Sequence, residues 1–204
     1  MKKFALALSM VSGVVLYAAD SPTERLSESA KVFNEIMATP DKGIPQDLLE
    51  KAHCIVLVPG MKQAAIGIGG KFGRGYAVCR KDNARGGWGA PAAVRVEGGT
   101  VGFQIGASST DVVMLVMNQN GMNRLLEDKF TLGAEASVAA GPVGRNTSAN
   151  TDVKLSAEIL SYSRSKGLFA GIALQGATLR PDSDANEALY GAKISNRKTA
   201  KSSK

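Results

Sequence analysis

The first part of the chain carries apolar residues at helical spacing. They recur every three or four positions, which places them on one face of an α-helix: Leu26, Ala30, Phe33 and Met37. Residues 21–24 read Ser-Pro-Thr-Glu, a capping box with proline at the first helical position. We therefore predict a helix over residues 21–39 with its apolar face packed into the core. A short second helix over residues 45–52 is expected to bury Leu48 and Leu49.

From residue 54 the pattern changes to short β-branched or alternating apolar runs that are separated by glycine. Pro59-Gly60 is expected to stop one run, and Gly98-Gly99 is a hairpin signal between two others. We predict strands over residues 55–58, 64–70, 73–80, 92–97, 100–107, 111–117, 134–140, 154–163 and 168–174. Residues 118–128 and 184–190 are predicted helices, the second one capped by Ser183 or Asp184.

Helices at the start of a chain and many short strands after them indicate an α+β fold with an antiparallel sheet. The glycines inside the strand runs indicate strong curvature. We therefore expect N-terminal helices followed by a strongly curved antiparallel β-sheet or a partly closed barrel. No internal repeat and no linker precede Gly191, so residues 20–191 are predicted to form a single domain, followed by a basic, disordered tail over residues 192–204.

The N-terminus has the pattern of an export signal. Lys2 and Lys3 precede an apolar run over residues 4–19. A short basic region before such a run is typical of a secretory signal peptide, which we predict over residues 1–19, with an uncleaved anchor as the alternative. The protein is therefore expected to be secreted into the periplasm or associated with the cell envelope.

Cys54 and Cys79 are the two cysteines of the chain. In an exported protein such a pair is a disulfide candidate. Two buried thiols are the alternative, and the sequence leaves both open.

The net charge of +7 is distributed unevenly along the chain. Residues 51–95 hold eight basic residues and one acidic residue, Asp82, whereas the flanking parts of the domain are acidic. Basic clusters attract anionic lipid at roughly 1 kcal/mol per residue near the surface. A solvated strand face is the alternative for the cations of this basic segment, among them Lys62, Lys71, Arg74, Arg80, Lys81 and Arg85.

Residues with catalytic or metal-binding patterns are scarce. His53 is the one histidine, it lies outside any recognisable catalytic motif, and the spacing of His53, Cys54 and Cys79 fits no zinc site. The glycine-rich run around Lys71 lacks the serine or threonine that a phosphate-binding loop requires, because Phe72 follows the lysine. We expect no enzyme activity, no metal and no cofactor.

Several ordered motifs resemble the SYLF-domain family. They are Ile44-Pro45, Leu48-Leu49, the Gly-Gly-Trp-Gly-Ala-Pro run over residues 86–91, residues 102–106, Leu132-Gly133, residues 140–144 and the closing stretch over residues 162–190. The resemblance extends over nearly all of the chain after the predicted signal peptide, and the chain resembles the exported bacterial branch of the family.

The resemblance implies binding to membrane phospholipids, including phosphoinositides in eukaryotic members, and an actin-regulator role in some fungal members. In the lipid-binding members an N-terminal amphipathic helix is implicated. The helix over residues 21–39 is net acidic here and therefore a poor ligand for anionic lipid. The lipid site is therefore expected in the basic segment or the tail, and export places the protein away from actin.

The sequence thus predicts a non-catalytic protein of the bacterial envelope that binds an anionic phospholipid surface and no nucleic acid. Aromatic rings favour the membrane interface. The predicted lipid-binding residues are Lys62, Lys71, Arg74, Arg80, Lys81, Phe72 and Trp88. A structural or protein-interaction module that binds an envelope partner through a sheet edge or the basic tail is the alternative.

Overall fold

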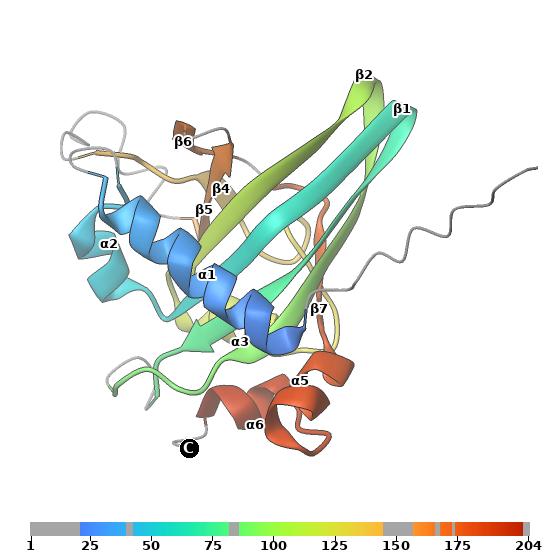
Figure 1. Cartoon of the computed structure of the whole chain (residues 1–204). Helices are drawn as coiled ribbons and strands as arrows, with labels where there is room; N and C mark the ends of the chain where they lie inside the picture. Colours follow the sequence, from blue (N-terminus) through green and yellow to red (C-terminus); the bar gives the residue numbers. More distant parts are fainter. Residues whose placement is uncertain are drawn as a thin grey trace, which may run out of the picture.

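The computed structural model describes residues 21–39, 43–81, 86–144, 157–165, 168–172 and 174–201. In these residues a curled sheet has the helices α1 (Pro22–Met37) and α2 (Gln46–Lys51) on one outer side (Figure 1). The helices α5 (Ser183–Tyr190) and α6 (Asn196–Lys201) lie side by side near one end. The predicted signal peptide and Arg85 lie outside the described residues. No helix in the described part has the length and apolar character needed to span a bilayer.

Two very long strands dominate the sheet. β1 (Cys54–Cys79) pairs antiparallel with β2 (Ala92–Val116) from end to end, so that they form a two-stranded ribbon. The ribbon turns back on itself half way along (Figure 1). Its two halves then face each other across a core of buried side chains that includes Val58, Met61, Val94, Val96, Val112 and Met114.

Glycine allows the two halves of β1 to approach closely. A Cβ added at Gly75 would lie 1.9 Å from the carbonyl oxygen of Leu57, and one added at Gly73 would lie 2.5 Å from a methyl carbon of Val58. Such distances leave no room for any side chain, so the absence of a Cβ is what permits the ribbon to bend double.

The prediction of separate short strands in this region is wrong. Pro59-Gly60 does not end a strand but forms a bulge, with a register shift between Val58 and Met61. Gly60 adopts a φ of 55°, which suits glycine, and its N–H donates to Asp111 Oδ1 at 2.9 Å. Gly98-Gly99 is not a hairpin turn either, because both residues pair within the ladder, with Lys71 and Gly70.

Five short strands complete the sheet: β3 (Phe130–Thr131), β4 (Val138–Ala140), β5 (Ile159–Ser165), β6 (Leu168–Gly171) and β7 (Thr178–Pro181). In the described part the strand order is β3-β7-β2-β5-β4. In addition, β1 pairs with β2 and β6 pairs with β5. The β4–β5 pair is parallel, whereas the other strand pairs are antiparallel. The α+β class with a strongly curved sheet is confirmed, although β3 and β7 were not predicted.

The capping box at the start of α1 is confirmed. Ser21 and Glu24 exchange side-chain and backbone hydrogen bonds, with donor–acceptor distances of 2.9 and 3.2 Å. The Tyr76 hydroxyl donates to the carbonyl of Pro22 at 2.6 Å and fixes this end of α1 against β1. α2 buries Leu48 and Leu49 as predicted. The helix predicted over residues 118–128 is present as α3 (Gln119–Leu125).

The prediction of the core face of α1 is wrong. The buried residues are Arg25, Ser29, Val32 and Ile36, one position before the predicted apolar face. In that predicted face Ala30 is exposed and the other three residues, Leu26, Phe33 and Met37, are half-buried. Val32 and Ile36 pack against the outer side of the sheet. The predicted apolar face therefore lies beside the sheet and lines a groove between α1 and α2.

The C-terminal part differs from the disordered tail expected after residue 191. Residues 196–201 form α6, and Asn196 is 2% exposed. Its side chain donates to the carbonyl of Ala93 at 3.1 Å and accepts from Asn186 Nδ2 at 2.6 Å. The cap of α5 is Asp182 rather than Ser183 or Asp184, because its carboxylate accepts from the N–H of Ala185.

Candidate functional site

The cysteine pair forms a disulfide. Cys54 and Cys79 are bonded, with their Cα atoms 4.0 Å apart. Both are fully buried in the core between the ribbon halves. Of the two alternatives that the sequence left open, the disulfide is the one present, and it connects the first and last residues of β1.

The predicted lipid-binding residues divide into two groups. Lys62, Lys71, Phe72 and Arg74 lie in the middle of β1, which we call the ribbon bend and define as residues 62–74. Here Ile68 is 79% exposed and Phe72 is 47% exposed. Two large exposed apolar side chains in a strand segment that also carries cations mark this segment as a candidate contact surface. Sequence reasoning missed Ile68, although it lies at the centre of the glycine-rich run.

The cations of the ribbon bend differ in their surroundings. Lys62 is exposed. Lys71 is half-buried, its Nζ lies 3.5 Å from the carbonyl oxygen of Gln175, and burial lowers its pKa. Arg74 is ion-paired to the buried Asp182 at 3.4 Å, and its guanidinium lies 5.8 Å from the ring centroid of Phe72. Of these three residues Lys62 is exposed, whereas Lys71 and Arg74 are half-buried.

The second group lies at the far end of β1. The Arg80 guanidinium donates from Nε to the carbonyl of Ala52 at 3.1 Å and from Nη2 to the carbonyl of Glu50 at 3.4 Å. These carbonyls belong to the C-terminal end of α2, where a cation is favourable. Trp88 is 38% exposed and lies under the same guanidinium, 4.3 Å from ring centroid to Cζ. Lys81 is next in the chain and half-buried.

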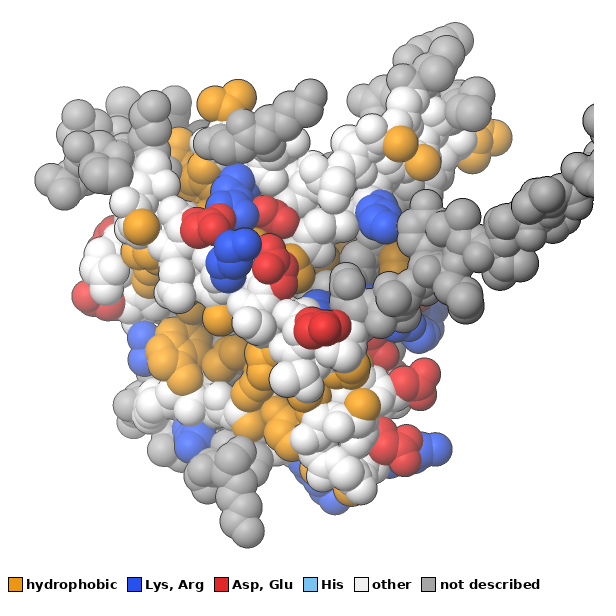
Figure 2. Space-filling model, in the orientation of Figure 1, with side chains coloured by type: hydrophobic (Ala, Val, Ile, Leu, Met, Phe, Trp, Pro, Cys, Tyr) orange, Lys and Arg blue, Asp and Glu red, His pale blue; other side chains and the backbone are white. Residues whose placement is uncertain are grey.

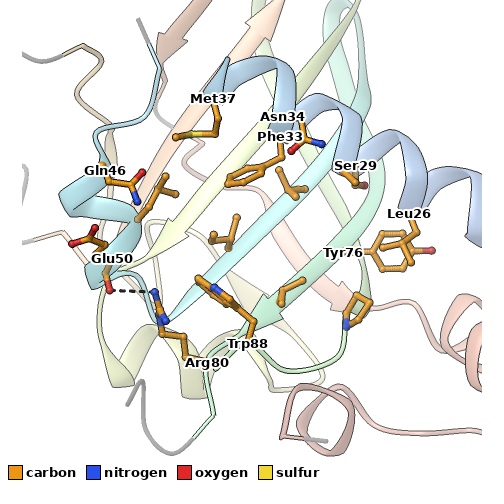
Figure 3. Close-up of a pocket in the computed structure, with 16 residues that line it drawn as sticks. Leu26, Ser29, Phe33, Asn34, Met37, Gln46, Glu50, Tyr76, Arg80 and Trp88 are labelled. Carbon is orange, nitrogen blue, oxygen red and sulfur yellow. Dashed lines mark hydrogen bonds between the residues drawn. The ribbon is translucent and has the colours of Figure 1, made fainter. Parts of the chain in front are cut away.

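An apolar groove of about 500 Å³ lies beside this second group (Figure 3). Its walls are α1 and α2, and its floor is the outer face of β1. Phe33 of α1 and Trp88 point into it from opposite sides. Hydrophobic side chains gather below α1 on the same face of the molecule in Figure 2. The helical spacing that begins at Leu26 was the sequence signal for this groove, but it was interpreted as a core face.

The described residues contain no cluster of side chains suited to metal binding. No group of three or more His, Cys, Asp or Glu side chains there could hold a metal ion. Burial and the nearby charge of Arg80 lower the pKa of His53, and its Nδ1 is buried without a hydrogen-bond partner among these residues.

Comparison with known proteins gives consistent matches. Residues 97–202 match the family Ysc84, described as Las17-binding protein actin regulator. An SH3 domain-containing protein of Schizosaccharomyces pombe is 38% identical over 150 residues, which is 72% of this chain and 34% of that protein. Human SH3 domain-containing YSC84-like protein 1 is 31% identical over 173 residues, which is 83% of this chain and 50% of that protein. LAS seventeen-binding protein 3 of Saccharomyces cerevisiae is 34% identical over 154 residues, which is 74% of this chain and 33% of that protein.

The longer of these matches covers more than four fifths of the chain. The chain spans about half the length of the animal relatives and a third of the yeast ones. None of the three names denotes an enzyme. The identities, the coverage and the family match together show that this chain belongs to the Ysc84 family, the SYLF-domain family that its motifs resemble.

Proposed function

We propose that the folded domain is a non-catalytic module that binds anionic phospholipid surfaces through the ribbon bend. The observation that carries the proposal is the exposure of Ile68 and Phe72 beside Lys62, Lys71 and Arg74. Apolar side chains at the tip of a rigid element can enter the interfacial layer of a membrane, and cations around them meet the phosphate groups.

The ribbon bend suits this role better than the second group. Arg80 donates from Nε and Nη2 to carbonyls at the end of α2 and lies over Trp88, so only part of its guanidinium can meet an external ligand. By contrast, Ile68 and Lys62 are exposed and belong to an element whose position is held by strand pairing on both sides of the bend. Export by the predicted signal peptide 1–19 would bring this surface to membranes of the periplasm or envelope.

The test is co-sedimentation of the protein with vesicles of phosphatidylcholine alone or mixed with phosphatidylglycerol, at low and high salt. We expect binding that requires phosphatidylglycerol and weakens with salt. Lys62→Gln with Lys71→Gln should weaken it roughly 10- to 30-fold at low salt, at about 1 kcal/mol per cation. Ile68→Ser with Phe72→Ser should weaken it at both salt concentrations, because apolar insertion is not screened.

The matched control is Arg197→Gln with Lys198→Gln, which removes two exposed cations from α6. This variant should bind like the unmodified protein. Loss of binding in this control, with no loss in the ribbon-bend variants, would refute the site. Binding that ignores lipid charge, or no binding to either vesicle, would favour the alternative of a protein-interaction module with an envelope partner.

A further inference from the structure

The groove beneath α1 is separate from the ribbon bend and has the form of a small-ligand site. Its volume of about 500 Å³ falls within the range of pockets that enclose small molecules. The α1 residues that line it extend from Leu26 to Met37, which at 1.5 Å per residue is a span of about 16 Å. An apolar groove of that length can hold an extended hydrocarbon chain.

The lining is apolar along its length and cationic at one end. Ile55, Leu57 and Val78 form the floor, and the half-buried face of α1 forms one wall. Arg80 lies at one end beside Trp88 (Figure 3). A guanidinium has five N–H groups, and no acceptor in the described part of the chain bonds to Arg80 Nη1. Glu50 also lines this end, with its carbonyl bonded to Arg80 and its side chain exposed.

We propose that this groove binds a single-chain anionic amphiphile of the fatty-acid type. The carboxylate meets the Nη1 end of Arg80, and the acyl chain lies along α1 over the floor of β1. The chemistry of the lining selects this occupant. An extended peptide would need backbone donors and acceptors along its length, whereas the floor presents apolar side chains. An uncharged hydrocarbon would make no use of the guanidinium at that end of the groove.

Trp88 makes the proposal directly measurable, because it is the only tryptophan in the chain and it lines the groove. The probe is cis-parinaric acid, a fluorescent fatty acid that quenches tryptophan emission by energy transfer at short range. We expect saturable quenching of Trp88 at one parinarate per protein, reversed by laurate. Dodecanol should displace the probe at least 10-fold less effectively, because it lacks the charge that Arg80 recognises.

Two substitutions on α1 distinguish binding in the groove from binding elsewhere on the surface. Ala30 is exposed and lines the groove, so Ala30→Phe fills the groove without removing a core contact. It should reduce parinarate affinity at least 10-fold. Ser27 is exposed on the same helix and does not line the groove, so Ser27→Phe is the matched control and should bind normally. Thermal melts of both variants should match that of the unmodified protein.

Arg80→Gln tests the charge. It should weaken laurate about 10-fold and leave dodecanol unchanged, provided that a melt shows the variant folded. Absence of saturable quenching would overturn the proposal, as would normal parinarate binding by Ala30→Phe. Equal displacement by laurate and dodecanol would overturn the role of Arg80. Vesicle binding should be unaffected by Ala30→Phe, and parinarate binding by the ribbon-bend substitutions, so the two proposals can fail separately.

Discussion

Cys54 and Cys79 are 25 positions apart in sequence, yet their Cα atoms lie 4.0 Å apart because β1 bends back to its own beginning. The backbone supports the same junction, since the N–H of Arg80 donates to the carbonyl of His53 at 2.8 Å. The two ends of a single strand are thus neighbours, with the core of the protein enclosed between the halves. This closure brings Arg80 and Trp88 to the end of α2 and so forms one end of the groove.

Removing the disulfide should lower stability. Chain-entropy estimates for a loop of this length give about 3 kcal/mol, so Cys54→Ala with Cys79→Ala should reduce the free energy of unfolding in urea by about that amount. Reductant should lower the urea midpoint of the unmodified protein and leave that of the double variant unchanged. If reductant left the urea midpoint of the unmodified protein unchanged, the Cys54–Cys79 disulfide would be contradicted.

Gly75→Ala should destabilise the ribbon, because the new methyl group would lie 1.9 Å from the carbonyl oxygen of Leu57. Overpacking of this kind typically costs 1–3 kcal/mol, and contact with backbone leaves little room to relax. Gly99→Ala is the matched control, since nothing lies within 4 Å of its added Cβ. Its urea midpoint should stay near that of the unmodified protein. Equal midpoints for the two variants would mean that the halves of β1 do not touch here.

Asn186→Ala should loosen the C-terminal helices. Asn186 accepts from the N–H of Ala93 at 2.8 Å and donates to Asn196, and all three residues are buried. Leaving a buried donor without a partner costs about 1–3 kcal/mol. Asn120→Ala, at an exposed position, should change stability by less than about 0.5 kcal/mol. Adding Asn196→Ala to Asn186→Ala should cost less than the sum of the single changes, because the two side chains share one network.

Acid should weaken the attachment of α1. Arg164 donates to Glu35 on α1 and also to Asp111 at 2.8 Å, and the hydrogen bond from Arg164 lowers the pKa of Glu35 below 4.5. A carboxyl with a lowered folded pKa contributes stability above its unfolded pKa and loses it as pH falls through the folded pKa. Urea midpoints should therefore fall below about pH 4.5, and less steeply in Glu35→Gln. If the urea midpoint of Glu35→Gln fell with pH as steeply as that of the unmodified protein, the Glu35–Arg164 pair would contribute nothing to stability.

Local signals in the sequence were sufficient for some elements. The Ser21–Glu24 capping box predicted where α1 begins, because its hydrogen bonds connect residues only three apart. The β-branched runs predicted strand residues correctly but not where the strands end, and the many strand glycines predicted curvature. The prediction of a hairpin turn at Gly98-Gly99 was wrong because the two-glycine signal is local. Pairing with Lys71 and Gly70 on the other strand keeps both glycines extended within the ladder.

The candidate sites were predicted only in part. The concentration of cations in residues 51–95 is visible in the sequence, but its division between the ribbon bend and the end of α2 is not. When a strand bends double, residues that lie close together in its sequence can belong to two different surfaces of the protein. The sequence predicted that Arg80 contacts lipid, but it gave no sign of the carbonyls of Ala52 and Glu50, which only the packing of α2 on β1 brings within reach.

The sequence by itself determined the family, the α+β class, the start of α1 and the position of the basic segment, since these depend on local spacing and composition. Tertiary structure decided which face of α1 is buried, which residues Arg80 contacts and whether the cysteines meet. The physical reason is the bend of the ribbon, which brings residues distant in sequence into contact. The two halves of β1 can approach closely because Gly73 and Gly75 have no Cβ atoms. The groove arises from that contact and from no single segment of the chain.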